Sequence, residues 1–132
     1  MKIIISIFIS FFITACSSIL DDDIDKKLEA VNFNKTYIAR FYINMWGGAA
    51  GGIDYFVNIQ KVDEKPNTSK NVVFKSSDHM ITICLKWTNN NKLNIITDAH
   101  RYTFNQLNRD IKVEILYSTS KKDFMQYKIC YR

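Results

Sequence analysis

Apolar and polar residues alternate along most of the chain after Asn32. The clearest case is the segment 80–88, in which every second side chain is apolar: Ile81, Ile83, Leu85 and Trp87. The side chains between them are Thr82, Cys84 and Lys86. A period of two places the apolar set on one face of an extended strand, so this segment predicts a strand with one buried face.

Six further segments have a strand-like composition, rich in aromatic and β-branched residues: 36–45, 53–59, 72–75, 93–97, 111–117 and 124–131. Polar or glycine-containing connections separate them, and the asparagine-rich turn 89–91 favours a hairpin between its neighbours. A helical turn is a candidate for 105–110. We therefore predict a mainly β protein, an antiparallel β-sandwich or a small barrel with at most one or two short helices.

The N-terminus has a different pattern. Lys2 is followed by a mainly apolar segment of eleven residues, Ile3–Ile13. A membrane-spanning helix needs roughly 20 apolar residues, so this segment fits the core of a secretory signal better. The sequence Ile13-Thr14-Ala15-Cys16 resembles the bacterial lipobox, in which the cysteine thiol receives diacylglycerol and the chain is cut before it. An ordinary signal peptide and a weak transmembrane anchor are the alternatives.

These features divide the chain into three parts: a lipoprotein signal peptide over 1–15, a lipidated cysteine with a flexible tether over 16–31, and a single β domain over 32–132. Three consecutive aspartates, Asp21 to Asp23, favour a solvated tether. Its last part, 25–31, can also form a short helix. In enterobacterial lipoproteins an aspartate after the cysteine causes retention in the inner membrane. The residue here is Ser17, which implies the outer membrane, on its periplasmic face.

Two cysteines remain once Cys16 is lipidated, and they are Cys84 and Cys130. An exported chain meets an oxidising compartment, where an even pair most simply forms a disulfide. Two buried thiols or a metal pair are the alternatives. Without paired histidines, two cysteines make a poor zinc set, so we expect neither a metal nor another cofactor.

Charge and length limit the classes of partner. The chain of 132 residues carries a net charge of +5, and removal of 1–15 takes away only Lys2, which leaves +4 on 117 residues. That length suits one domain with one core. A mildly basic domain favours an acidic protein or anionic lipid head groups. The chain has no long block of lysine and arginine, so we do not expect it to bind nucleic acid.

All four glycines lie in one hexapeptide between two predicted strands, directly after Trp46: Gly47, Gly48, Gly51 and Gly52. Such a loop permits positive φ angles or the close approach of another backbone. One hypothesis is a projecting loop that meets a partner, with Trp46 as its aromatic anchor and Tyr42 and Tyr55 beside it. The alternative is an ordinary hairpin connection, with Trp46 in the core.

The sequence offers little support for catalysis. His79 and His100 each lie near an aspartate, Asp78 and Asp98, but neither a G-x-S-x-G elbow nor an H-E-x-x-H motif is present. Surface histidines at strand ends explain both positions. Glu114 stands between basic and apolar neighbours, without the second carboxylate that glycoside hydrolysis needs. We therefore expect a protein that is not an enzyme.

One stretch of the chain suggests a family. The segment 34–52, NKTYIARFYINMWGGAAGG, followed by the strand that ends in Lys86-Trp87, resembles a group of small uncharacterised bacterial lipoproteins. The match covers about half of the mature chain. Members of that group are often encoded beside antibacterial lipase toxins of the type VI secretion system. The resemblance therefore implies an immunity protein.

These observations lead to one functional hypothesis: a lipid-anchored periplasmic binding protein that inhibits an envelope-targeting toxin. A structural or assembly lipoprotein of the outer membrane, with no toxin partner, is the alternative. A lipoprotein inhibitor of animal lysozyme fits less well, because the basic enzyme and a domain of charge +4 repel each other.

Overall fold

The structure of the chain, a computed structural model, describes residues 24–47, 51–106 and 110–132. The predicted signal peptide, Cys16 and Gly48 lie outside these residues. The described part contains nine strands and one helix: β1 (Ile24–Val31), β2 (Tyr37–Trp46), β3 (Gly52–Lys61), β4 (Val72–Ser76), β5 (Ile83–Asn89), β6 (Lys92–Thr97), β7 (Thr103–Phe104), β8 (Lys112–Tyr117), α1 (Lys121–Met125) and β9 (Cys130–Tyr131). It contains no helix with the length and apolar character needed to cross a membrane.

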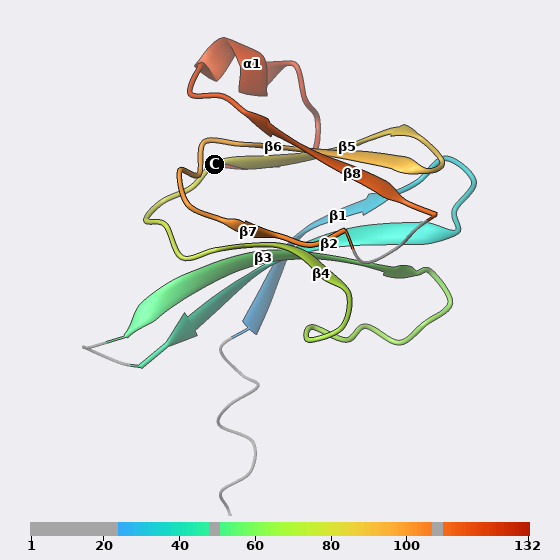
Figure 1. The fold of residues 1–132 in the computed structure, drawn as a ribbon, viewed down its shortest axis with the longest axis horizontal. Coiled ribbons are helices and arrows are strands. Elements are labelled where there is room, and N and C mark those ends of the chain that lie inside the picture. Colours follow the sequence, from blue (N-terminus) through green and yellow to red (C-terminus); the bar gives the residue numbers. More distant parts are fainter. Residues whose placement is uncertain (1–23, 48–50, 107–109) are drawn as a thin grey trace, which may run out of the picture.

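The strands form two sheets that pack face to face (Figure 1). One sheet has the order β1-β2-β3-β4-β7 and the other the order β8-β6-β5-β9. The prediction of a mainly β fold is confirmed. Of the two predicted architectures, a β-sandwich and a small barrel, the structure is the sandwich, since its sheets do not close into a barrel. The predicted hairpin around 89–91 is also present, because β5 and β6 pair antiparallel from Ile83–Thr97 to Asn89–Lys92.

One strand pair departs from the predicted antiparallel pattern. β6 and β8 run parallel, with Leu93 opposite Val113 and Ile95 opposite Ile115. A parallel pair needs a crossover connection, because the chain must return to the end of the sheet where the first strand began. The segment between the two strands makes this crossover by way of β7, which joins the edge of the other sheet.

The core fills the space between the sheets. The face that the period-two pattern predicts for 80–88 is buried: Ile81, just before β5, and Ile83, Leu85 and Trp87 within it are all at most 5% exposed. The opposing sheet contributes mainly the inward side chains of its two longest strands: Ala39, Phe41, Ile43, Tyr55, Val57 and Ile59. Both sheets thus bury one alternate set of side chains, as a sandwich requires.

The predicted tether is too long, because its last part is a strand. β1 pairs with β2 from Ile24–Asn44 to Val31–Ile38, so neither a flexible segment nor a helix is present over 24–31. Lys27 is an extra residue between the paired Lys26 and Leu28. Such a bulge shifts the alternation by one position, which hides the strand from a period-two search. Pairing with β2 also overrides the helical preference of Lys-Lys-Leu-Glu-Ala.

The predicted strand 124–131 is mostly wrong. Residues 121–125 form α1, and only Cys130 and Tyr131 pair with β5. Phe124 is 5% exposed and packs with Cys84 and Ile96 on the outer face of the second sheet. One apolar side chain therefore holds the helical turn in place. The predicted helical turn 105–110 lies partly outside the described residues, and positions 105 and 106 are not helical.

A buried hydrogen bond joins the two sheets at one end. The indole N–H of Trp87, on β5, donates to the backbone oxygen of Ala30, on β1, at 2.8 Å. Beside it, Asn32 is 2% exposed and connects the β1–β2 turn to the β5–β6 turn, because its amide donates to Asn90 O at 2.9 Å. The Asn32 side-chain oxygen accepts the N–H of Thr36 and Tyr37. These bonds satisfy the buried amide and fix both turns together.

A disulfide links the C-terminal strand to β5. Cys84 and Cys130 are bonded, at directly opposite positions of the β5–β9 pair. Cys84 lies on the predicted strand face with Thr82 and Lys86. That face is not open to solvent here, because α1 covers Cys84 completely. The bond therefore anchors the segment that carries α1.

Removal of this disulfide should destabilise the domain markedly. The cysteines are 46 positions apart, and chain-entropy reasoning gives a cost of about 4 kcal/mol for the variant Cys84→Ala/Cys130→Ala. Urea unfolding of the variant and the oxidised protein measures the difference. Alkylation of both thiols in the native, non-reduced protein would contradict the pairing.

Candidate functional site

The hairpin of β2 and β3 projects beyond the sandwich, and we call its described end the hairpin tip: Met45, Trp46, Gly47, Gly51 and Gly52 (Figure 1). Trp46 is 50% exposed and Met45 is 57% exposed. Trp46 is therefore not the core residue of the alternative hypothesis. Two large apolar side chains that project on opposite faces of one exposed strand end are available to a partner.

Two of the glycines are required by the position of Trp46. An added Cβ at Gly51 would lie 1.6 Å from the backbone oxygen of Trp46, so no side chain fits there. Gly52 is directly opposite Trp46, and its added Cβ would lie 2.9 Å from Cζ2 of the indole. The indole therefore covers the bare backbone of Gly52, an arrangement that holds an exposed aromatic ring in one place.

The base of the hairpin is fixed to the neighbouring loop. Ser77 Oγ donates to Asp54 Oδ1 at 2.6 Å, and Lys75 Nζ lies 3.9 Å from the other Asp54 oxygen. Both partners of Asp54 lie at or just after the end of β4. The tip is thus a solvent-exposed end on a fixed base.

The structure corrects the placement of the two tyrosines beside the loop. Tyr42 is 4% exposed and its ring stacks on Phe56, with centroids 5.1 Å apart, on the outer face of the first sheet. Tyr55 is also 4% exposed, and its ring lies parallel to Phe41 in the core. Burial raises the pKa of the Tyr55 hydroxyl. Neither tyrosine joins Trp46 in a surface patch, because each strand is covered on both faces.

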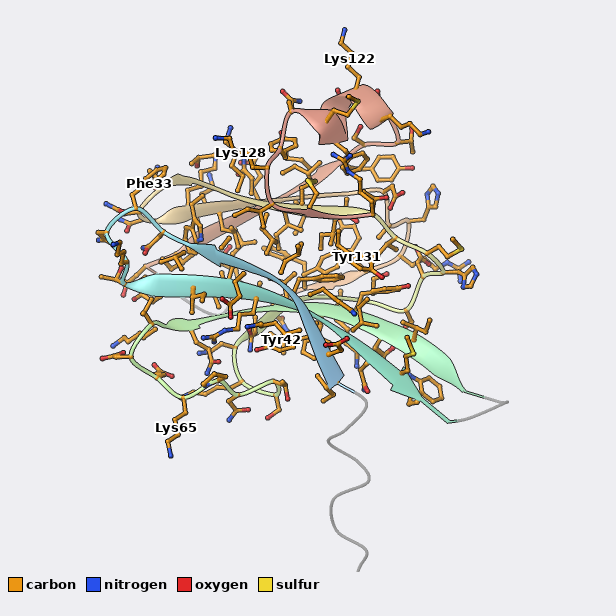
Figure 2. The ribbon with its side chains drawn as sticks, turned by 180° about the vertical axis from the view of Figure 1, so that it is seen from behind. Phe33, Tyr42, Lys65, Lys122, Lys128 and Tyr131 are labelled. Carbon is orange, nitrogen blue, oxygen red and sulfur yellow. A yellow bond between two sulfur atoms is a disulfide. The ribbon has the colours of Figure 1, made fainter. Side chains whose placement is uncertain are left out.

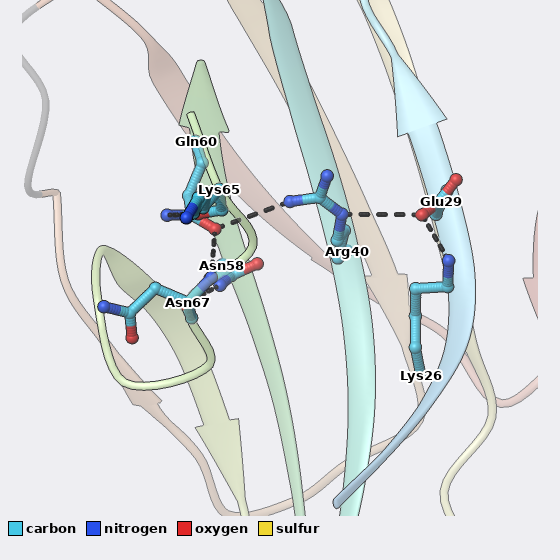
Figure 3. Close-up of polar contacts among 7 residues, drawn as sticks. All are labelled: Lys26, Glu29, Arg40, Asn58, Gln60, Lys65 and Asn67. Carbon is cyan, nitrogen blue, oxygen red and sulfur yellow. Dashed lines mark hydrogen bonds and ion pairs between the residues drawn. The ribbon is translucent and has the colours of Figure 1, made fainter. Parts of the chain in front are cut away.

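A polar network covers the outer face of the first sheet (Figure 3). Arg40 is 7% exposed, and its guanidinium lies 3.5 Å from Glu29 Oε1 and 3.4 Å from Gln60 Oε1. Gln60 also accepts the N–H of Asn67, and the Asn58 amide donates to Asn67 O at 2.8 Å. The loop after β3 therefore folds back over the sheet. The bonds of this loop go to β3, and the Arg40 guanidinium joins β2 to them, so the network has a structural role.

The two histidines do not form a catalytic arrangement. The side chain of Asp78 accepts the backbone N–H of His100 at 2.6 Å and that of Arg101 at 2.8 Å. His100 Nδ1 lies 3.3 Å from the hydroxyl of Tyr117. Asp98 accepts the backbone N–H of Thr82 at 2.7 Å. The carboxylates thus bind backbone groups of the opposite loop and hold the loops together.

No group of three or more histidine, cysteine, aspartate or glutamate side chains that could hold a metal ion occurs within 24–47, 51–106 and 110–132. Two surface features of the described residues are considered as binding sites: the exposed hairpin tip and a groove at the opposite end of the domain. Sequence reasoning identified the first through its glycines and missed the second. Its lining residues come from three separate segments, which no local pattern connects.

No family model, curated protein or solved structure matches this chain.

The loop contact of Asp78 predicts a specific acid sensitivity. The backbone N–H groups of Arg101 and His100 lower the pKa of the Asp78 carboxyl. Because the pKa of Asp78 is lower in the folded protein than the value of about 3.9 in the unfolded chain, the ionised carboxylate stabilises the fold at pH values above about 3.9. This contribution to the free energy of unfolding is lost as the pH falls through the pKa of the folded state. The difference in unfolding free energy between wild type and Asp78→Asn should therefore be larger at neutral pH than in acid.

The free energy of unfolding in urea, measured from neutral pH down to acid pH, checks the prediction. Asp63→Asn, at an exposed loop position, is the control. An equal pH dependence of wild type and Asp78→Asn would show that the contact does not contribute in this way.

Proposed function

We propose that this chain is a lipid-anchored binding protein that inhibits an envelope-targeting toxin without catalysing a reaction. In this proposal the lipid on Cys16 holds the domain at the periplasmic face of the outer membrane. The hairpin tip meets the toxin. The family resemblance of segment 34–52 supports the choice of a toxin as the partner.

The exposure of Trp46 is the observation that carries the proposal. Trp46 is half exposed, so it stabilises the fold of this small domain less than a tryptophan buried in the core would. At a protein interface the same side chain is a frequent hot spot, because its large, rigid area loses little entropy on binding. Met45 beside it adds an adaptable apolar contact.

The rest of the hairpin has the properties that an inhibitor needs. Its base is held through Asp54, and Gly51 and Gly52 hold the indole in a defined position. A partner that docks on the tip meets a pre-organised surface and pays little ordering entropy.

Replacement of Trp46 by alanine should weaken binding to the proposed toxin partner by roughly 2 kcal/mol or more. The melting temperature should change little, because the ring is half exposed. Calorimetry with the purified toxin and co-expression in cells measure binding and protection. Tyr117→Ala, at a 52% exposed aromatic residue of β8, is the matched control.

Unchanged affinity in Trp46→Ala would remove the hairpin tip from the interface. No binding and no protection by the unaltered protein would contradict the proposed function itself.

The anchoring part of the proposal concerns Cys16. Cys16→Ser should abolish palmitate labelling and move the protein out of the membrane fraction, because the thiol is the proposed acylation site. Labelling that persists in Cys16→Ser would overturn this part.

A further inference from the structure

A groove of about 380 Å³ lies at the opposite end of the domain from the hairpin tip, between the edges of the two sheets. One wall comes from the end of β1 and the turn after it, with Val31 45% exposed and Phe33 68% exposed. The other wall comes from the segment 126–129, which leads into β9. Figure 2 shows Phe33 and Lys128 at this same end.

The floor of the groove is an unpaired strand edge. On this side of β5, pairing with β9 covers only Ile83 and Cys84, and one further bond runs from Leu85 N–H to Ile129 O at 2.9 Å. Beyond Leu85, no described strand pairs with β5 on this side, whereas on its other side Trp87 is opposite Leu93 of β6. Backbone groups two residues apart point to the same edge of a strand. The N–H and C=O of Trp87 are therefore directed toward the groove.

The charge of the groove has one sign. Lys86 and Lys128 line it, and its described lining contains no aspartate or glutamate. Lys86 Nζ lies 5.5 Å from the centroid of the Tyr127 ring. No ion pair links Lys86 or Lys128 to a carboxylate of the described residues, whereas other lysines are paired, such as Lys92 with Glu114 at 2.7 Å. A ligand with carboxylates would supply the negative charges that Lys86 and Lys128 lack as partners in this groove.

We propose that this groove binds an extended, acidic segment of a partner protein, which adds as a strand to the free edge of β5. Backbone hydrogen bonds to Trp87 supply the pairing, as in other cases of strand addition. Carboxylates on one face of the segment meet Lys86 and Lys128, and apolar side chains on the other face meet Val31 and Phe33. This site is separate from the hairpin tip and goes beyond the proposed function.

The observations favour a peptide over two other occupants. The lysines would attract an anionic membrane surface, but a membrane cannot enter a concave groove and form backbone hydrogen bonds with a free strand edge. A second copy of this chain would bring the same lysines against each other, which like charge disfavours.

A synthetic peptide in which glutamate alternates with valine, carrying a fluorescent label, tests the proposal with the full mature protein in detergent. Fluorescence anisotropy should show saturable binding that weakens with salt. The variant Lys86→Glu/Lys128→Glu should lower the affinity at least about tenfold and should bind the matching peptide with lysine in place of glutamate. The control is Lys65→Glu/Lys112→Glu, which makes the same change in net charge at two exposed positions outside the groove and should leave the affinity nearly unchanged.

Strand addition is tested by methylation of alternate peptide nitrogens. The modified peptide keeps its charges but cannot pair with β5, so its binding should be lost. Equal binding of the methylated peptide, or equal loss in the control variant, would overturn the proposal. No binding at millimolar peptide, or binding of this face to anionic phospholipid vesicles or to a second copy instead, would also overturn it. Trp46→Ala should leave peptide binding unchanged, which separates this result from the test of the hairpin tip.

Discussion

One buried hydrogen bond closes the sandwich. The side chain of Trp87 crosses from β5 to the last part of β1, where the backbone oxygen of Ala30 accepts its indole N–H at 2.8 Å. Trp87 is 5% exposed, so without this acceptor the donor would be buried and unsatisfied, at a cost of about 1–3 kcal/mol. β1 buries little apolar surface of its own, and most of its side chains are exposed. The Trp87 bond therefore keeps this charged edge strand in contact with the second sheet.

The two ends of the domain differ as a consequence. At the Trp87 end, Asn32 and Asn90 join the β1–β2 and β5–β6 turns, which lie side by side in Figure 1. At the other end the β2–β3 hairpin extends past the sheets with Trp46 exposed. One tryptophan thus holds the sheets together and the other is presented to solvent. The proposed partner sites follow this division, since the hairpin tip lies at the free end and the groove lies beside the closed end.

The sequence predicts the elements that follow a regular period and misses those that depend on distant contacts. The strand around Ile83 and Leu85 shows its buried face directly. β1 is hidden by the bulge at Lys27. α1 depends on the packing of Phe124 against Cys84 and Ile96, which no local pattern reveals. The hairpin tip was predictable because glycines that touch Trp46 are conspicuous in the sequence. The burial of Tyr42 was not, since Phe56, on which its ring stacks, belongs to a different strand.

Trp87 and Trp46 have different roles in the fold, and hydrogen exchange of their indole N–H groups tests this difference directly. NMR resolves the two signals, and Trp46→Phe assigns them. The Trp46 indole should exchange at the rate of an exposed group, because the side chain is half exposed. The Trp87 indole should exchange only through opening that separates the sheets, with a free energy close to that of global unfolding. Fast exchange at Trp87, or equal protection of both indoles, would show that the Trp87 hydrogen bond does not hold the two sheets together.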